Sequence, residues 1–478
     1  MISPYALVYL LSYIGPAAIG FLALIVYTHL LSPAEYGLYV VGSSIAGVVS
    51  ALFFAWVRQS VSRYQACAPQ LDLRIEAGVA FAGTVAVVAC LAPVTILIVR
   101  PNVGVGTIAG ALFLSFSLTA FEISQEFRRA RLNARRFAAI AFLRSALGLV
   151  LGLSAVQLGG GGLGLLFAIA ISFLVANILS FERDLTKPLN QVSIDYLAQF
   201  ARYGLPFSLG AVAFALHGVV DRLGVAYLLG QSGAGYYGIA ADITRQLVGI
   251  LASSVAAALF PIAFRSLAEQ GPAATRSRLK EGIELLLALI APVAIWLAIA
   301  ANVVASALLG SEYQASVGVL LPLLAIGRMC GAVNQFYLHI SFQLAERPLL
   351  QVLHDSLILI LNMALLFVLT PAFGLSGAAS AVLMAEAFGI PLGIWLSRRA
   401  FPLPFDPAGM IRLIAANTVM AAATYAAKIA FEGHGIATLL IVGSAGGIAY
   451  AGAALLLDLA GLRSMIVSYL RPQLAASG

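Results

Sequence analysis

Long apolar stretches follow one another along almost the whole chain, and short polar connectors separate them. A helix that crosses about 30 Å of hydrocarbon needs about 20 residues at a rise of about 1.5 Å each. Stretches of this length therefore predict membrane-spanning helices, and they leave no room for a separate soluble domain. The pattern predicts fourteen spans, near residues 7–31, 36–57, 77–99, 104–124, 137–158, 163–181, 204–229, 235–262, 285–309, 315–341, 350–370, 375–396, 410–430 and 436–457.

The composition agrees with this pattern. Of the 478 residues, 61% are hydrophobic and 10% are charged, and the mean hydropathy is +0.99. A soluble domain carries roughly 25% charged residues. The chain is therefore predicted to be an all-α integral membrane protein. Its first apolar stretch is too long for the apolar region of a signal peptide, so we expect it to be the first span.

Basic residues gather in every second connector, whereas the opposite connectors hold only Arg100, with Lys428 at the edge of the thirteenth span. Because basic loops stay in the cytoplasm, both chain termini are predicted to be cytoplasmic, which requires an even number of spans. The connectors explain the net charge of +7, so no nucleic-acid partner is expected. The basic connectors contain Arg58, Arg63 and Arg74; Arg128, Arg129, Arg131, Arg135 and Arg136; Arg183, Lys187 and Arg202; Arg265, Arg276, Arg278 and Lys280; Arg347; Arg398 and Arg399; and Arg463 and Arg471.

The most basic connector, QEFRRARLNARR at residues 125–136, allows two interpretations. Each positive charge near an anionic leaflet contributes about 1 kcal/mol, so the segment would suit anionic lipid headgroups or a pyrophosphate. The simpler interpretation is a signal that only fixes the orientation of the chain in the membrane.

Two short sequences occur twice, in each case between apolar stretches. LLSPAEYGLY at residues 30–39 returns 198 positions later as LLGQSGAGYY at residues 228–237, and GGLG at 161–164 resembles GLSG at 374–377. Together they predict a chain of two similar halves. The predicted domains are an N-terminal six-helix lobe at 1–181, a cytoplasmic linker with an interfacial helix at 182–203, a C-terminal six-helix lobe at 204–396, and two additional helices with a tail at 397–478.

Ionisable residues inside the spans are the candidate functional groups, because a charge in a span costs at least about 2.5 to 3.5 kcal/mol on insertion scales. The seventh span carries His217 and Asp221 on one helical face, with Arg222 beside it; the eighth carries Asp242 and Arg245 on one face. These residues either serve an ion or substrate, or neutralise each other as structural pairs.

Further embedded charges lie in later spans. Arg328 lies near the middle of the tenth, and a guanidinium matches phosphate oxygens and keeps its charge. Glu386 in the twelfth is either a titrating carboxyl or the salt-bridge partner of an arginine. The sequence thus predicts substrate-binding arginines and ion-coupling acids. The former are Arg222, Arg245, Arg328 and Arg144; the latter are Asp221, Asp242 and Glu386, with His217.

Neither a metal site nor an enzymatic motif is expected. His339 and His354 lie fifteen residues apart on different helices, and neither they nor Asp355 show a spacing such as HxxxH. The chain contains no Walker A sequence and no HExxH motif. We therefore expect no metal, no cofactor and no catalytic residues, and transport driven by a gradient or by disposal of the substrate.

Four segments in order resemble the polysaccharide transport branch of the multidrug/oligosaccharidyl-lipid/polysaccharide (MOP) exporter superfamily, which includes the Wzx-type flippases. They are LLSPAEYGLYVVGSSI, LLGQSGAGYYGIAADI after Asp221 and Arg222, LLGSEYQASVGVLLPLLAIGRM at 308–329, and FGLSGAASA at 373–381. The resemblance implies two six-helix lobes related by a parallel repeat, two C-terminal helices, and alternating access.

The resemblance also implies a function. Its members carry undecaprenyl-diphosphate-linked oligosaccharides to the outer leaflet of the bacterial cytoplasmic (inner) membrane, for lipopolysaccharide or exopolysaccharide synthesis, with coupling to a proton or sodium gradient. A polysaccharide polymerase and a chain-length regulator would be the expected protein partners, beside membrane lipids.

Three alternatives remain open. A MurJ-type lipid II flippase also has fourteen spans, but concentrates basic residues in its N-terminal lobe, whereas spans one and two here contain none. A MATE-type cation or drug antiporter normally has twelve spans and prefers an anionic pocket. A membrane-embedded polymerase or glycosyltransferase would need a large outer loop with catalytic residues, and the outer connectors here are short.

Overall fold

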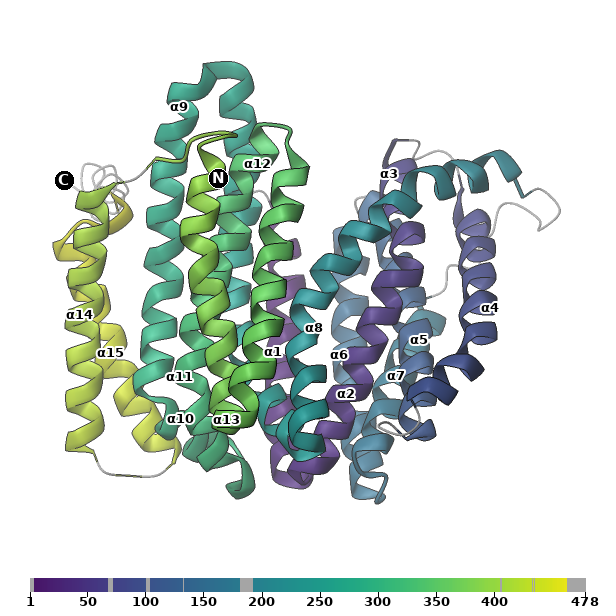
Figure 1. Ribbon diagram of the computed structural model, residues 1–478, viewed down its shortest axis with the longest axis horizontal. Helices are drawn as coiled ribbons and strands as arrows, with labels where there is room; N and C mark the ends of the chain where they lie inside the picture. The colour runs from purple at the N-terminus through teal and green to yellow at the C-terminus, as the bar shows by residue number, and fades with distance from the viewer. Residues whose placement is uncertain are drawn as a thin grey trace, which may run out of the picture. The chain divides into compact units, whose positions relative to one another are not determined.

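The computed structural model describes residues 4–67, 72–99, 104–131, 133–180, 192–404, 406–431, 433 and 435–461. Within these ranges the chain is helical and contains no strand, as predicted (Figure 1). Arg100, Arg183, Lys187, Arg463 and Arg471 lie outside the described residues.

The chain divides into two compact units, residues 1–238 and 239–478. The predicted domains, 1–181, 182–203, 204–396 and 397–478, stay predictions. The helices up to the boundary are α1 (Pro4–Leu30), α2 (Pro33–Val49), the π-helical η1 (Ser50–Phe54), α3 (Ala55–Cys67), α4 (Arg74–Val99), α5 (Val105–Ala130), α6 (Ala134–Gln157), α7 (Gly161–Leu179) and α8 (Ile194–Thr244), whose last residues belong to the second unit. The second unit continues with the π-helical η3 (Arg245–Gly249), α9 (Ile250–Ile299), α10 (Ala301–Leu308), α11 (Ser311–Val333), the π-helical η4 (Asn334–Leu338), α12 (His339–Leu344), α13 (Pro348–Ser397), α14 (Pro407–Ala430), α15 (Ile436–Leu456) and the 3-10 turn η5 (Leu459–Gly461).

Three long helices change direction at a glycine. Gly230 in α8, Gly271 in α9 and Gly374 in α13 have φ of 74°, 82° and 60°, a conformation that residues with a Cβ rarely adopt. Ten helices of the described chain are long and apolar enough to cross a membrane, and Gly15–Leu30 is a shorter apolar helix. The three breaks and this shorter helix raise the ten to fourteen passes, the predicted number.

The two repeated sequences adopt matching local structures. Gly161 and Gly374 occupy equivalent positions in GGLG and GLSG, and both have a positive φ, 55° and 60°. Ser32 caps α2 through a capping box with Glu35, and the equivalent Gly230 begins the second part of α8. The helices that follow these two connectors both contain a π-helical segment, η1 and η3. The repeat is therefore visible in backbone geometry as well as in sequence.

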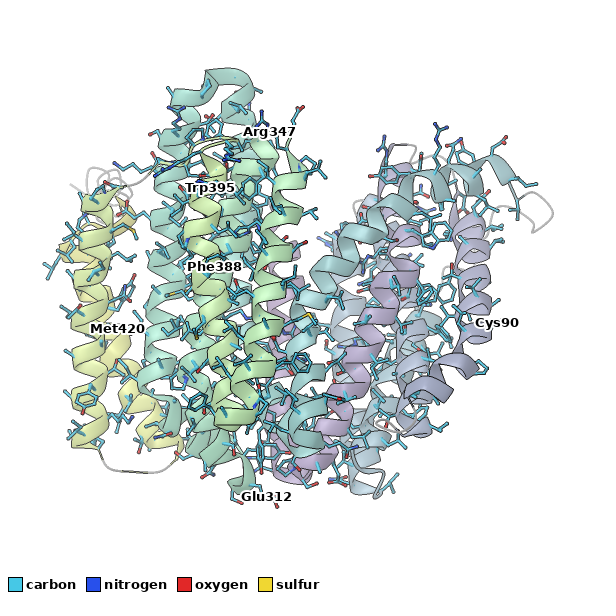
Figure 2. All side chains as sticks on the ribbon, viewed as in Figure 1. Cys90, Glu312, Arg347, Phe388, Trp395 and Met420 are labelled. Atoms are coloured by element: carbon cyan, nitrogen blue, oxygen red, sulfur yellow. The ribbon has the colours of Figure 1, made fainter. Side chains whose placement is uncertain are left out.

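Within each unit, the helices bury small and apolar residues against one another. In the first unit α7 packs on α5 and α6, and α1 packs on α6. In the second unit α11 packs on α9 and α13, and α14 packs on α9 and α15. Arg347 and Glu312 lie at opposite ends of the second unit (Figure 2). The end with Arg347 is the one that the charge pattern predicts to be cytoplasmic.

The beginning of α8 is helical where an interfacial helix was predicted, but it is continuous with the spanning part of α8 up to Gly230. Its Phe200 is fully buried in an apolar cluster with Val57, Val61 and Leu73. This contact fixes the start of α8 to the first unit.

Candidate functional site

The first unit contains a cavity of about 470 Å³ lined by residues of α1, α3, α5, α6 and α7. Arg58, Arg129 and Arg144 line it together with Glu122 and Glu126. Arg58 forms an ion pair with Glu122, and Arg129 Nη2 lies 3.0 Å from Glu126 Oε1. Two of the three arginines are thus partly neutralised by carboxylates.

Arg144 differs from the other two arginines of this cavity. Its guanidinium carbon lies 3.7 Å from the centre of the Phe173 ring, a cation–π contact. Its Nε is buried and has no hydrogen-bond partner among the described residues. The predicted substrate-binding Arg144 is therefore placed in a cavity wall without a carboxylate partner in the described structure.

Sequence reasoning missed the rest of this cavity. It assigned Arg58 and Arg129 to connectors, whereas α3 continues to Cys67 and α5 to Ala130. The spacing of Glu122, Glu126 and Arg129 puts them on one helical face, and this was the available signal. Spans one and two contain no basic residues, but other helices of the N-terminal lobe place arginines in this cavity. The expected difference from MurJ-type proteins therefore holds for those two spans and not for the whole lobe.

A second, smaller cavity of about 210 Å³ is lined by apolar residues such as Phe81 and Ile123 and by three arginines, Arg74, Arg128 and Arg131. Arg74 donates two hydrogen bonds to Asp72, of 2.8 and 2.6 Å. The segment 125–136 is thus not a simple loop, because it contains the end of α5 and the start of α6.

Arg128 in the lining of this smaller cavity is buried and fixed by hydrogen bonds. It donates to Gln125 Oε1 at 3.0 Å and to the carbonyl oxygen of Ser180, also at 3.0 Å.

The predicted functional residues of α8 differ in burial. Asp221 is buried, whereas His217 and Arg222 are half-buried, and all three make polar or electrostatic contacts. In the same helix Asp242 is buried and its Oδ1 lies 3.1 Å from Arg245 Nη2, whose side chain is 61% exposed. Asp242 and Arg245 therefore form the ion pair that was one of the two interpretations, and Arg245 is also the first residue of η3.

Glu386, on α13, accepts two hydrogen bonds from the side-chain amide of Asn334. Its Oε2 accepts a hydrogen bond of 2.8 Å from Asn334 Nδ2, which also donates to the Glu386 backbone carbonyl at 2.9 Å. A Cβ on Gly331 would lie 2.9 Å from Glu386 Oε1, so α11 and α13 approach closely here. Asn334 is the first residue of η4, and π-helical segments are frequent at functional sites.

Arg328 lies midway along the continuous helix of α11, η4 and α12, which the apolar span Ser311–Leu344 covers. It is half-buried, and within the described part of the chain it has neither an ion-pair nor a hydrogen-bond partner. Arg328 thus has no neutralising carboxylate in the described structure.

His339, His354 and Asp355 come together, although they are separated in sequence and lie on two helices. His339 Nε2 lies 3.2 Å from His354 Nδ1 and 3.1 Å from Asp355 Oδ1. The turn at Ala345–Arg347, in which Glu346 has a φ of 55°, folds α12 back onto α13. The hairpin thus brings together three residues whose spacing in the sequence matches no metal-binding motif.

The apolar helices long enough to cross a membrane and the repeated connectors define an all-α multi-pass membrane protein. The sequence profile of a family described as "Polysaccharide biosynthesis protein" matches residues 26–318, so the chain belongs to that family. A comparison with curated proteins finds no match.

Solved structures support the fold. Lipid II flippase MurJ in an inward closed conformation has a TM-score of 0.75 at 12% identity, covering 96% of this chain and 100% of its own. An inward-facing multidrug resistance MATE family transporter of the MOP superfamily has a TM-score of 0.61 at 16% identity, covering 82% of this chain and 97% of its own. A MOP superfamily transporter from Pyrococcus furiosus, described as having a binding pocket of reverse polarity, has a TM-score of 0.50 at 16% identity, covering 83% of this chain and 91% of its own. At these identities the likeness shows the fold alone.

Proposed function

We propose that this transporter is a flippase that moves a lipid-diphosphate-linked oligosaccharide from the cytoplasmic to the outer leaflet by alternating access. It works in the bacterial cytoplasmic membrane with both termini in the cytoplasm, and its lipid is undecaprenyl. The observation that carries the proposal is Arg328, an arginine halfway along an apolar span with no carboxylate partner in the described chain.

Inserting an arginine in the middle of a span costs about 2.5 to 3.5 kcal/mol on insertion scales, so such a residue usually has a functional role. A diphosphate supplies one, since a guanidinium fork matches its oxygens and stays charged at physiological pH. Arg144 offers the same chemistry in the first unit, beside a cavity that already holds polar groups. Arg222 and Arg245 are the further candidates for phosphate contacts.

Coupling to a proton or sodium gradient is assigned to Glu386, Asp221, Asp242 and His217. Glu386 is the first choice because it is buried and its hydrogen-bonded partner Asn334 is a neutral amide. Asp242 ranks below it because Asp242 already pairs with Arg245.

A lipid II flippase is the second candidate. The observation that favours it is the cavity with three arginines in the first unit, together with the fold shared with MurJ. Both candidates carry a lipid diphosphate and differ in the sugar, so the chemistry assigned to the arginines holds for either.

The test is a strain that lacks this gene, in which lipid-linked oligosaccharides are quantified in each leaflet. Complementation uses the wild type, Arg328→Ala, Arg328→Lys and, as a matched control, Arg265→Ala, which removes an exposed arginine paired with Glu269. We expect a complete repeat unit to build up on the cytoplasmic side, and the wild type and Arg265→Ala to clear it.

Arg328→Ala should fail to clear the intermediate, and Arg328→Lys should clear it slowly, because lysine keeps the charge without the fork. Build-up of lipid II instead would favour the second candidate. An intermediate that accumulates outside the cell unpolymerised, or none at all, would contradict both.

A further inference from the structure

We propose that His339, His354 and Asp355 form a binding site for a divalent transition-metal ion of the zinc type, which ties three spans of the second unit together. The site is independent of the proposed substrate, because it rests on residues that no step of the transport argument uses. It lies in the α12–α13 hairpin, whose connecting turn contains Arg347 at one end of the unit (Figure 2).

Three potential ligand atoms converge at the spacing of a metal centre. The distances are 3.2 Å from His339 Nε2 to His354 Nδ1, 3.1 Å from His339 Nε2 to Asp355 Oδ1, and 3.8 Å from His354 Nδ1 to Asp355 Oδ1. Ligand atoms of a tetrahedral centre with bonds of about 2.0 to 2.1 Å lie about 3.3 to 3.4 Å apart. A single point lies about 2.0 Å from all three atoms, which is the usual length of zinc bonds to nitrogen and oxygen.

The tautomer of His354 favours coordination. His354 Nε2 lies 2.8 Å from the carbonyl oxygen of Gly389, which only accepts, so the ring proton is on Nε2. In the neutral ring this leaves the lone pair on Nδ1, the atom that faces His339 and Asp355. A metal-bound histidine usually donates its other ring N–H to a carbonyl or carboxylate in this way.

Hydrogen bonding within the cluster cannot satisfy all three atoms at once. If both rings are neutral, His339 Nε2–H is the one ring proton that lies between His354 Nδ1 and Asp355 Oδ1, and it makes a linear bond to only one of them at a time. A cation at the shared point instead meets all three lone pairs together. Imidazole nitrogen favours zinc and the neighbouring transition metals over magnesium, calcium or sodium.

The three candidate ligands differ in burial. His339 is 4% exposed and His354 is fully buried, whereas the Asp355 side chain is 30% exposed. The partly exposed carboxylate is the side from which the ion and a fourth ligand such as water would reach the site. A Cβ on Gly393 would lie 2.9 Å from His354 Nε2, so the second part of α13 packs directly against the ring.

The ligands come from different helices, so a bound ion would connect these helices. His339 belongs to α12, while His354 and Asp355 belong to the first part of α13. Gly389, whose carbonyl orients His354, belongs to the second part of α13 beyond the break at Gly374. An ion at this site therefore links two spans directly and the third through one hydrogen bond.

The experiment uses the full-length protein in detergent, without an affinity tag and after treatment with a chelator. Zinc sulfate is added, unbound metal is removed by gel filtration, and bound zinc is measured by elemental analysis beside the thermal midpoint from intrinsic fluorescence. We expect one retained zinc per chain and a midpoint that rises with zinc concentration. Cobalt in place of zinc should give the visible absorption bands of a tetrahedral site in the wild type.

Two variants and one control identify the ligands. Asp355→Asn keeps the shape of the side chain and should weaken zinc binding by more than the 10- to 100-fold that loss of an outer partner costs. His339→Asn should do the same, while His29→Asn, which changes an exposed histidine of α1, should bind as the wild type does.

Two results overturn the proposal. One is a wild type that retains no zinc and shows no shift of its midpoint; if that midpoint instead follows pH, and His339→Asn removes the dependence, the cluster holds only a proton. The other is retention of zinc by Asp355→Asn and His339→Asn with wild-type affinity. The cobalt spectrum of the wild type decides the matter even if a variant does not fold.

Discussion

The two copies of the repeated connector touch each other through their glycines, and this contact should tolerate no side chain. A Cβ on Gly37 would overlap the carbonyl oxygen of Gln231 and lie 3.0 Å from Gly235 N. A Cβ on Gly235 would overlap the carbonyl oxygen of Pro33 and lie 3.1 Å from Gly37 N. Gln231 is equivalent to Pro33 in the repeat, so the contact is reciprocal: each copy offers the same glycine and receives the same carbonyl.

Gly37→Ala should therefore force two backbones apart, because the obstacles are main-chain atoms that cannot rotate away. Overpacking of this kind costs about 1 to 3 kcal/mol. Gly47→Ala is the matched control in the same helix, since a Cβ there meets nothing within 4 Å. A glycine inside a helix is roughly 0.5 to 1 kcal/mol worse than alanine, so this control should be stabilising.

The assay is the thermal midpoint of the purified protein in one detergent, measured for Gly37→Ala, Gly235→Ala, the double variant and Gly47→Ala. Each single change should lower the midpoint, and the control should raise it. The double variant should lose less than the two single losses added together, because one separation of the turns relieves both overlaps. A Gly37→Ala midpoint at or above that of Gly47→Ala, or fully additive losses, would refute the reciprocal contact.

Two further predictions concern buried side chains. Phe200→Ala should destabilise the protein by about 3 to 5 kcal/mol, because Phe200 is fully buried. The control Leu205→Ala changes a side chain that is 53% exposed and should cost little. Thermal unfolding of both variants checks this. Asn334→Ala should cost about 1 to 3 kcal/mol, because it takes the amide from the Glu386 carboxylate, and Glu386→Gln added to it should restore part of the loss in the same assay.

The sequence predicted the spans well because apolar length is a local property of the chain. It also located the connectors, since Gly161 and Gly374 must reach a positive φ that few other residues allow. The ends of the helices were harder to predict. A helix can continue beyond its apolar stretch when its charged residues form ion pairs, as Arg58 does with Glu122.

Contacts between distant residues could not be predicted from one sequence. His339 and Asp355 meet only because the turn at Ala345–Arg347 sets the register of two helices, and a one-turn shift would separate them. Similarly, nothing in the sequence says that Asn334 donates to the Glu386 carboxylate. Such pairings depend on packing angles that composition and spacing do not contain.

The arginines differ in what an approaching phosphate would have to displace. Arg58 and Arg129 already pair with Glu122 and Glu126, so an anion at either must compete with a fixed carboxylate. In the described chain Arg144 meets a phenyl face. We therefore expect Arg144→Ala to abolish clearance of the lipid-linked intermediate in the deletion strain, at normal protein levels.

The matched control for Arg144 is the double variant Arg58→Ala/Glu122→Ala. It removes an arginine from the same cavity together with its carboxylate, so the net charge of the lining stays unchanged. This variant should keep most of the transport, whereas Arg58→Ala alone should not, because it leaves Glu122 unpaired in the cavity and repels the diphosphate. Equal loss in Arg144→Ala and the double variant would mean that the cavity needs all its polar groups for structure. Transport would then have to rest on Arg328 without help from the first unit.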